Sequence, residues 1–273
     1  MSAALPEKLR TAAVHAFLGL MALVSVFPFV WMLIGATNVS RDISRGKITF
    51  GSALLDNYAK FASLYDVTQV FWNSGKIALI GSLLTLVVSS AAGYGFEVFR
   101  SPLRERVYQG VLLSMMVPFA ALMIPLFTLM AALDMLDTHM AVILPTVASA
   151  YLIFYFRQSS KAFPSELREA ARLDGLKEWQ IFLYVYVPVM RSTYAAAFII
   201  VFMAAWNGFL WPLIALQSVE LKTITLVVSS LGSAYTPDYG VIMVATVLAT
   251  LPTLIVFFAM QRQFVQGMLG SVK

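Results

Sequence analysis

The stretch TAAVHAFLGLMALVSVFPFVWMLIGATNVS, residues 11–40, contains no Asp, Glu, Lys or Arg. A helix that crosses the hydrocarbon core of a bilayer needs about 20 consecutive apolar residues. The apolar region of a cleaved secretion signal is shorter, about 7–15 residues. We therefore expect this stretch to form an uncleaved first membrane span.

The rest of the chain follows the same pattern. Of its 273 residues, 60% are hydrophobic and 12% are charged, whereas a soluble domain is about 45–50% apolar and about 25% charged. The composition predicts an all-α, polytopic membrane helical bundle with about six transmembrane helices. Residues 1–273 are expected to form one transmembrane domain, with spans at about 11–36, 76–97, 107–133, 138–157, 192–217 and 238–261.

The cationic residues indicate the orientation of the spans. If the N-terminus is cytoplasmic, thirteen of the nineteen Lys and Arg residues lie inside, and six lie outside: Arg41, Arg45, Lys47, Lys60, Lys76 and Lys222. The positive-inside rule favours this choice. An even number of spans then places both termini in the cytoplasm. Because the charges lie between apolar runs, the net charge of +5 does not predict nucleic-acid binding.

Several classes of site are absent from the sequence. The chain has no Cys, and its two His residues, His15 and His139, are far apart, so we expect no metal centre. It contains no H-E-x-x-H or G-x-S-x-G motif, so we expect no catalytic residues. Glu97 and Glu105, near the cytoplasmic end of the second and third spans, are expected to be solvated or paired with Arg100 or Arg104.

Most of the spans contain a proline: Pro28, Pro118, Pro125, Pro145, Pro212 and Pro252. Membrane helices tolerate proline where neighbouring helices or side chains satisfy the freed carbonyl groups. These prolines are consistent with helices that bend as the protein changes shape. They are also common in membrane helices of any kind, and both interpretations stay open.

The internal segment 158–191 is the most charged part of the chain. Ser165 is suited to an N-cap, Glu166 is suited to the first turn of a helix, and Gly175 is suited to the left-handed position after the last turn. The sequence thus predicts a cytoplasmic helix of about ten residues that ends at Asp174 and Gly175. A second apolar stretch then leads to Pro188.

One face of this short helix is expected to carry Leu167, Ala170 and Ala171, which are spaced to lie together. Small side chains with charges at their rim suit insertion into a groove on a partner protein. The alternative is an ordinary amphipathic helix lying on the membrane surface. The mixed charge of this segment favours the first interpretation.

Glu169-Ala170-Ala171, then Asp174-Gly175, then Pro188 resemble the cytoplasmic coupling loop of binding-protein-dependent ABC importer permeases. The resemblance extends over nearly the whole chain. Three further elements resemble the carbohydrate branch of the family: Asn73-Ser74, Trp206-Asn207 and Phe264-Val265-x-Gly267. Within this branch the chain looks most like the second permease subunit of maltose-type systems. Leu176 departs from the pattern, because relatives often carry Ala there.

The resemblance implies a division of labour between chains. In that family the coupling loop docks into a cleft on a separate ATPase subunit, and closure of two ATPases moves the permease helices between inward-open and outward-open states. This chain has no G-x-x-x-x-G-K-[ST] motif, so ATP and Mg are expected on the ATPase. The other implied partners are a homologous permease subunit, an extracytoplasmic solute-binding protein, a carbohydrate substrate and the lipid of a bacterial inner membrane.

Polar and aromatic groups near the middle of a membrane are candidates for the transport pathway. Trp206 and Asn207 are expected near the middle of the fifth span, and Trp211 and Tyr151 are further candidates. Asn can bond sugar hydroxyls, and an aromatic ring can stack on a sugar. The alternative is that Asn207 bonds a neighbouring helix and that the aromatic side chains serve packing or face lipid.

Three other functions remain open. The first is an importer of the same family for a polyol, glycerol phosphate or an acidic oligosaccharide. The second is a stand-alone secondary transporter, which usually carries internal repeats and charged residues within its spans. The third is an intramembrane enzyme, for which the sequence offers no nucleophile or metal set.

Overall fold

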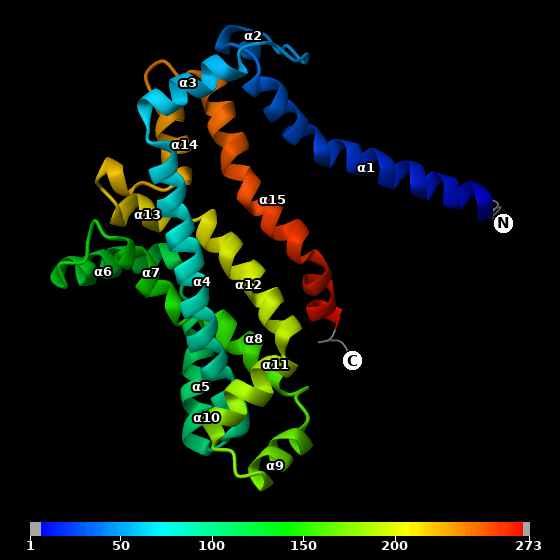
Figure 1. Ribbon diagram of the computed structural model, residues 1–273, viewed down its shortest axis with the longest axis vertical. Coiled ribbons are helices and arrows are strands. Elements are labelled where there is room, and N and C mark those ends of the chain that lie inside the picture. The colour runs from blue at the N-terminus through cyan, green and yellow to red at the C-terminus, as the bar shows by residue number, and fades with distance from the viewer. Residues whose placement is uncertain (1–6, 270–273) are drawn as a thin grey trace. The chain divides into compact units, whose positions relative to one another are not determined.

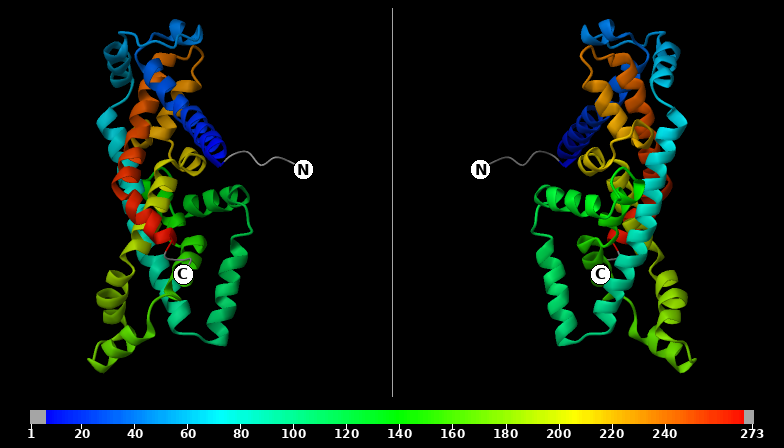
Figure 2. Two further views of the ribbon diagram at one scale, coloured as in Figure 1. Left: turned by 90° about the vertical axis from the view of Figure 1, so that its right-hand side faces the viewer. Right: turned by 90° about the vertical axis from the view of Figure 1, so that its left-hand side faces the viewer.

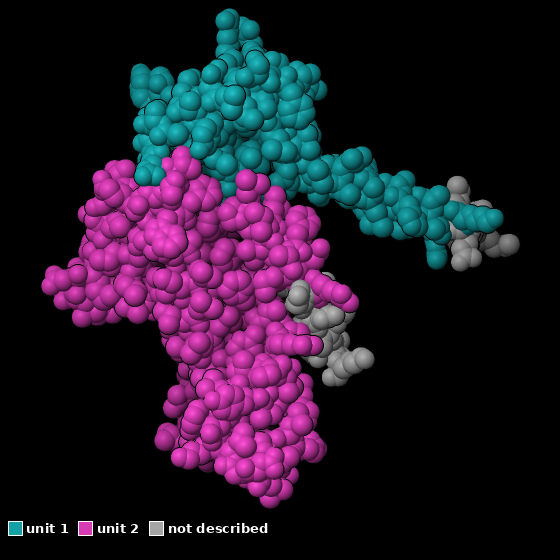
Figure 3. Space-filling view, in the orientation of Figure 1, with its two compact units in different colours: residues 1–66, 228–250 teal, residues 67–227, 251–273 magenta. Residues whose placement is uncertain are grey.

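A computed structural model describes residues Glu7–Leu269 (Figure 1). Within this range most residues are helical and none forms a strand, which confirms the all-α prediction. The chain divides into two compact units, shown in different colours in Figure 3. Residues up to Asp66 and Val228–Thr250 belong to unit 1, and Val67–Val227 and the residues from Leu251 onward belong to unit 2.

Unit 1 contains the helices α1 (Glu7–Ala36), α2 (Ser40–Ser44) and α3 (Leu54–Leu64), the end of α14 (Ile224–Gly232) and the beginning of α15 (Tyr239–Leu269). Two buried asparagines close the end of α1. The Asn38 amide donates to Ile34 O and Thr49 O at 2.8 and 2.9 Å, and the Asn57 amide donates to Ala36 O at 3.0 Å. The last carbonyl groups of a helix need such partners, so these amides fix the chain direction after α1.

The first turn of α15 is held by Asp238. Its carboxylate accepts hydrogen bonds from Gly240 N at 3.1 Å, the Ser40 hydroxyl at 2.5 Å and Lys60 Nζ at 3.1 Å. An acidic side chain is favourable at a helix N-terminus because of the exposed N–H groups. A Cβ atom on Gly240 would lie 2.7 Å from the Asn57 amide, so this close packing requires glycine.

Unit 2 is built around α4 (Val67–Val98), which packs against α7 (His139–Val147), α8 (Ala150–Ser160) and α12 (Arg191–Trp206). Small residues make close contact possible, as expected for helices in a membrane. A Cβ atom on Gly93 of α4 would lie 2.7 Å from Phe156 Cβ and 2.8 Å from Arg157 N. The backbones of α4 and α8 are therefore in near contact at this point.

Three pairs of helices in unit 2 are sharply bent. α5 (Pro102–Ser114) meets α6 (Phe119–Ala132) at 103°, which is clear in Figure 2, and α7 meets α8 at 40°. The run from α10 (Glu178–Ile181) through the π-helix η1 (Phe182–Tyr186) to α11 (Val187–Val189) meets α12 at 81°. Pro118, which has no N–H to continue α5, is the N-cap of α6.

The remaining elements of unit 2 are α9 (Ser165–Leu173), α13 (Leu210–Ala215), the 3₁₀-helix η2 (Val219–Leu221) and the start of α14. Asn73 and Ser74 hold the segment before α14. The Asn73 amide donates to Glu220 O at 2.7 Å, and the Ser74 hydroxyl accepts from Ile224 N at 2.8 Å. The Asn-Ser pair noted in the sequence thus fixes a loop that is distant in the chain.

Another loop is fixed by Asp137, a non-glycine residue with a positive φ of 58°. Its carboxylate accepts from Gln217 N at 2.8 Å, from Ser218 N at 2.9 Å and from the Ser218 hydroxyl. These bonds, with that of the Ser218 hydroxyl foremost, hold the pKa of the Asp137 carboxyl below its usual range. The segment before α7 is thereby joined to the segment after α13.

Among the described residues, three unbroken helices are long and apolar enough to cross a membrane: Arg10–Ala36, Val67–Val98 and Tyr239–Arg262. Counting each bent pair as one span raises the number to six, which agrees with the expected number. The helix expected at 192–217 ends at Trp206, and residues 207–209 separate it from α13, which contains Pro212. The motif residues Phe264, Val265 and Gly267 fall in α15, and their side chains lie outside the described part.

Candidate functional site

The short helix α9 lies at one end of unit 2 and connects α8 to α10 (Figure 1). It begins at Ser165, as expected for a helix in this segment, but Ser165 is not the N-cap. Pro164 occupies that position with an extended backbone, φ −61° and ψ 125°, and no side chain caps the helix. The expectation that Ser165 caps α9 was therefore wrong, because proline already supplies the extended conformation that the cap position needs.

The end of α9 has the structure that the Asp-Gly pair predicts. Gly175 has a φ of +83°, and Gly175 N donates to Arg172 O at 3.0 Å. Leu176 N donates to Ala171 O, also at 3.0 Å. These two bonds form a Schellman motif, in which a left-handed glycine terminates the helix and satisfies its last carbonyl groups. Gly175 thus sets the angle between α9 and the chain that follows.

Ion pairs join α9 to α10. The Glu178 carboxylate contacts Arg168 Nη2 at 3.2 Å and Arg172 Nε at 2.5 Å. Arg168 and Arg172 are four residues apart, so both lie on one side of α9. Glu178 is in the first turn of α10, where the helix dipole also favours a negative charge. One carboxylate therefore clamps two successive helices.

The outward side of α9 differs from the expected face. Leu167 and Ala170 are exposed, but Ala171 is 6% exposed and points into the protein. Leu173, which the sequence did not single out, is 89% exposed. The acidic Glu169 and Asp174 are also exposed. Of the residues that resemble the coupling loop, Glu169, Ala170 and Asp174 are accessible, whereas Ala171 lies on the buried side of α9.

Pro188 lies in α11, directly after the π-helix Phe182–Tyr186. Val187 N donates to Phe182 O, five residues earlier, instead of four as in an α-helix. Pro188 has no N–H, so it leaves one further carbonyl without its usual helical donor. Single π-helical turns occur frequently at functional sites, and this one separates the exposed α9–α10 corner from the apolar α12.

Two buried hydroxyl groups meet where the chain leaves α8 toward α9 and where it returns in the π-helix. Ser160 Oγ at the end of α8 lies 2.7 Å from Tyr186 Oη in the returning π-helix. The Tyr186 ring packs against Tyr94 at 4.7 Å and Phe163 at 5.3 Å between ring centroids. We call residues 161–185 the coupling protrusion and the Ser160–Tyr186 pair its base, because the chain leaves the bundle at Ser160 and returns at Tyr186.

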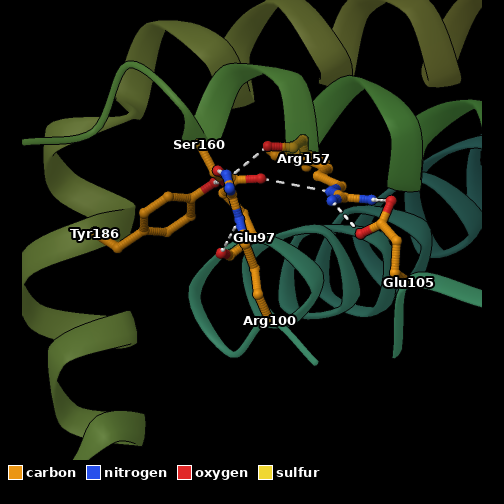
Figure 4. A network of polar contacts seen from close by, with 7 residues as sticks. Glu97, Arg100, Glu105, Arg157, Ser160 and Tyr186 are labelled. Carbon is orange, nitrogen blue, oxygen red and sulfur yellow. Dashed lines mark hydrogen bonds and ion pairs between the residues drawn. The ribbon is translucent and has the colours of Figure 1, made fainter. Parts of the chain in front are cut away.

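Arg157 of α8 lies beside this base (Figure 4). Its guanidinium donates to both carboxylate oxygens of Glu105, at 2.7 and 3.2 Å, and approaches Glu97 at 3.4 Å. Arg100 pairs with Glu97, as one of the expected alternatives, but the main partner of Glu105 is Arg157. No pattern in the sequence indicated this pairing, because Arg157 and Glu105 are 52 positions apart.

Two clefts lie beside α4, α7 and α12. One, of about 450 Å³, is lined by Ile77, Val142, Thr146, Ala205 and Trp211 among others. The second, of about 250 Å³, shares Thr146 and Ala205 and adds residues that include Thr85, Ser149 and Tyr151. Neither lining contains a charged residue. Of the four pathway candidates, Trp211 lines the first cleft and Tyr151 lines the second.

Trp211 also has a structural role. Its ring is 5% exposed, and Trp211 Nε1 donates to Ala141 O at 2.9 Å. Ala141 lies four residues before Pro145, whose missing N–H leaves this carbonyl without a helical donor. Trp211 therefore supplies the bond that the proline removes from α7.

Trp206 is buried at 4% exposure and lies outside the residues that line the two clefts. Its ring stacks on Phe202 at 5.9 Å and contacts Phe71 at 6.0 Å. Such aromatic pairs are typical of helix packing. This environment supports the packing interpretation of Trp206.

Asn207 is exposed and follows the last residue of α12. Its amide donates to Met203 O at 2.8 Å, within its own helix. The alternative expectation, that Asn207 bonds a neighbouring helix, is wrong for this amide. Because Asn207 is exposed, it stays a candidate for the transport pathway.

Among the residues that the structure describes, no group of three or more His, Asp or Glu side chains is placed to hold a metal ion. Two acidic residues in or beside the protrusion, Glu178 and Glu105, are instead paired with arginines. The arrangement therefore offers an exposed helix for docking and uncharged clefts for a solute.

Comparison with known proteins agrees with this arrangement. Residues 87–270 match the model of a family described as binding-protein-dependent transport system inner membrane component. The chain is 67% identical, over 273 residues and 100% of both chains, to the lactose transport system permease protein LacG of Rhizobium radiobacter. It is 35% identical over 267 residues to the arabinooligosaccharides transport system permease protein AraQ of Bacillus subtilis, covering 96% of this chain and 95% of that protein.

A more distant relative is named for a different substrate. The chain is 30% identical over 269 residues to the sn-glycerol-3-phosphate transport system permease protein UgpE of Escherichia coli, covering 95% of this chain and 96% of that protein. Among solved structures, a bacterial ABC transporter involved in the import of the acidic polysaccharide alginate matches with a TM-score of 0.80. The match covers 96% of this chain and 100% of that chain at 20% identity, which supports the fold.

Proposed function

Because this chain belongs to the family of binding-protein-dependent transport system inner membrane components and is a permease subunit of an ABC importer, we propose that it forms a sugar translocation pathway with a second, homologous permease. The family membership favours this function over the stand-alone secondary transporter. It also makes the chain a multi-pass protein of the inner membrane. We propose in addition that both termini lie in the cytoplasm, as the distribution of Lys and Arg favours.

Energy reaches this chain through the coupling protrusion. The observation that carries this proposal is the exposed outward side of α9, with Leu167, Ala170 and Leu173 accessible at the end of unit 2. An apolar helix surface with an acidic rim suits a groove on another protein. Two ATPase subunits, which bind ATP and Mg, are the proposed partners on this side, and this chain contacts one of them.

The substrate we propose is a neutral disaccharide of the lactose type. The support is the 67% identity to a lactose permease over the whole chain, together with the uncharged linings of the two clefts. A phosphate ester or an acidic sugar would call for Arg or Lys side chains near the solute. Tyr151 offers an exposed hydroxyl and ring, and Asn207 offers an amide to the same solute. An extracytoplasmic solute-binding protein delivers the sugar.

Transport in a reconstituted system tests the substrate. The chain is placed in liposomes with its partner permease, the two ATPase subunits and the binding protein, and uptake of labelled lactose is measured with and without ATP. ATP-dependent uptake of lactose, well above that of an arabinose oligosaccharide or glycerol 3-phosphate, is expected. Uptake of glycerol 3-phosphate in preference to lactose would overturn the proposed substrate.

A matched pair of variants tests the docking surface. Leu167→Asp places a charge on the outward side of α9, and Leu55→Asp makes the same change on the exposed Leu55 of α3. Leu167→Asp is expected to abolish co-purification of the ATPase subunits, because a buried carboxylate in the groove would lack a partner. Leu55→Asp is expected to leave co-purification intact. Equal co-purification of both variants would contradict docking through α9.

A further inference from the structure

Arg157 is a buried cation near the end of α8. It is 7% exposed, and its guanidinium forms two bonds to Glu105 and one to Glu97 (Figure 4). Arginine can hold a carboxylate with two parallel bonds because its planar group presents a fixed set of donors. The geometry of the Arg157–Glu105 pair therefore fixes direction as well as distance.

The partners of Arg157 come from different helices. Glu97 is in the last turn of α4, and Glu105 is in the first turn of α5. The guanidinium also lies over the ring of Tyr108 in α5, at 3.9 Å from its centroid. A cation over an aromatic ring is attracted to it, and more strongly where water is excluded. Arg157 thus holds α8, α4 and α5 at one point.

This point lies next to the coupling protrusion. Ser160, whose hydroxyl pairs with Tyr186 at the base, is one turn after Arg157 on α8. The protrusion also contacts the residue directly after α4, because the Arg168 guanidinium lies 5.3 Å from the Phe99 ring centroid. A displacement of α9 therefore acts on α8 through the closed base, and α8 is fixed to α4 and α5 by Arg157.

We propose that Arg157 is a positioning residue that passes the displacement of α9 to α4 and α5. This inference rests on the proposed function. The pair with Glu105 links Arg157 to α5, which continues after a 103° bend into α6. The pair with Glu97 links Arg157 to α4, the central helix of unit 2. Without the pair to Glu105, α9 still binds its partner, but α5 no longer follows the movement of α9.

The test compares Glu105→Gln with Arg106→Gln in the reconstituted importer. Glu105→Gln keeps an oxygen acceptor for Arg157 and leaves Glu97 in place, so the buried cation is not left without a partner. Arg106 is an exposed residue of α5 that takes no part in this network. The quantity measured is the number of ATP molecules hydrolysed per lactose imported, which a loss of folded complex alone does not change.

Glu105→Gln is expected to raise this ratio by about fivefold, the low end of the effect of a typical coupling between sites, with ATPase co-purification unchanged. Glu105→Asp is expected to restore much of the coupling, and Arg106→Gln is expected to match the wild type. A wild-type ratio in Glu105→Gln would overturn the inference while leaving the proposed function intact. Failure of the wild-type complex to import any sugar would instead overturn the proposed function.

Discussion

Trp211 Nε1 donates a hydrogen bond to Ala141 O, at 2.9 Å, across 70 residues of sequence. Ala141 is the residue whose carbonyl Pro145 leaves without a donor in α7. Both groups are buried, since Ala141 is 0% and Trp211 is 5% exposed. The proline and the tryptophan are therefore two parts of one arrangement, in which a bent helix is kept free of an unsatisfied carbonyl.

This arrangement predicts the effect of removing the donor. Trp211→Phe keeps most of the ring but leaves Ala141 O unpaired, so it is expected to lower stability by about 1–3 kcal/mol. Pro145→Ala restores an N–H that can reach Ala141 O. In the Pro145→Ala background, Trp211→Phe should therefore cost much less. Thermal unfolding of the four purified proteins measures both costs, and equal costs in the two backgrounds would contradict the explanation.

The sequence predicted those features that depend on neighbouring residues. The Asp-Gly pair after an amphipathic helix predicted the left-handed Gly175. The long apolar runs predicted the membrane spans. The sequence did not predict the cap of α9, because Pro164 and Ser165 are both suited to a helix start, and the extended backbone of Pro164 takes the cap position.

Contacts between distant segments were also beyond the sequence. The pairing of Arg157 with Glu105, and of Trp211 with Ala141, depends on how α8 meets α5 and how α13 meets α7. Spacing along the chain carries no information about such contacts. For the same reason the expected face of α9 was only partly correct. Helical periodicity places Leu167, Ala170 and Ala171 together, but the neighbouring helices decide that Ala171 is the buried member.

The adjacent pathway candidates Trp206 and Asn207 are expected to behave differently. Trp206 is buried between Phe202 and Phe71, so Trp206→Ala should cost about 3–5 kcal/mol of stability, as for other buried aromatic residues. Thermal unfolding and the yield of assembled complex measure this loss. An unchanged unfolding temperature would show that the Trp206 ring does not support the packing of α12.

Asn207→Ala removes an exposed amide whose one intramolecular bond is to its own helix. The stability should therefore change by less than about 0.5 kcal/mol, and the complex should assemble normally. Uptake of lactose is expected to change if the amide contacts the sugar. Unaltered uptake kinetics, measured with the intact complex and its binding protein, would remove Asn207 from the transport pathway.

The loop held by Asp137 should be sensitive to acid. The bonds from Ser218 and Gln217 hold the pKa of the Asp137 carboxyl below its usual range. A group whose pKa is lowered by folding stabilises the protein above its unfolded pKa, about 3.9 for Asp, and this contribution is lost as the pH falls through the lower folded value. The unfolding temperature should therefore fall below about pH 4, and less steeply in Asp137→Asn. Identical pH profiles would contradict this assignment.

The sharpest prediction concerns Gly175, because its φ of +83° is unfavourable for residues with a Cβ atom. A Cβ atom there would meet no other atom within 4 Å, so any effect of substitution comes from the backbone and not from a clash. Gly175→Val is expected to uncouple or dissociate the ATPase subunits, because a β-branched residue resists this conformation. Gly175→Asn should be tolerated better, since Asn adopts left-handed conformations more readily. Co-purification of the ATPase and substrate-stimulated ATP hydrolysis measure the two outcomes. If Val and Asn impair both equally, lost flexibility or an altered docking surface would be responsible, and if neither variant impairs them, the angle set by Gly175 does not matter for coupling.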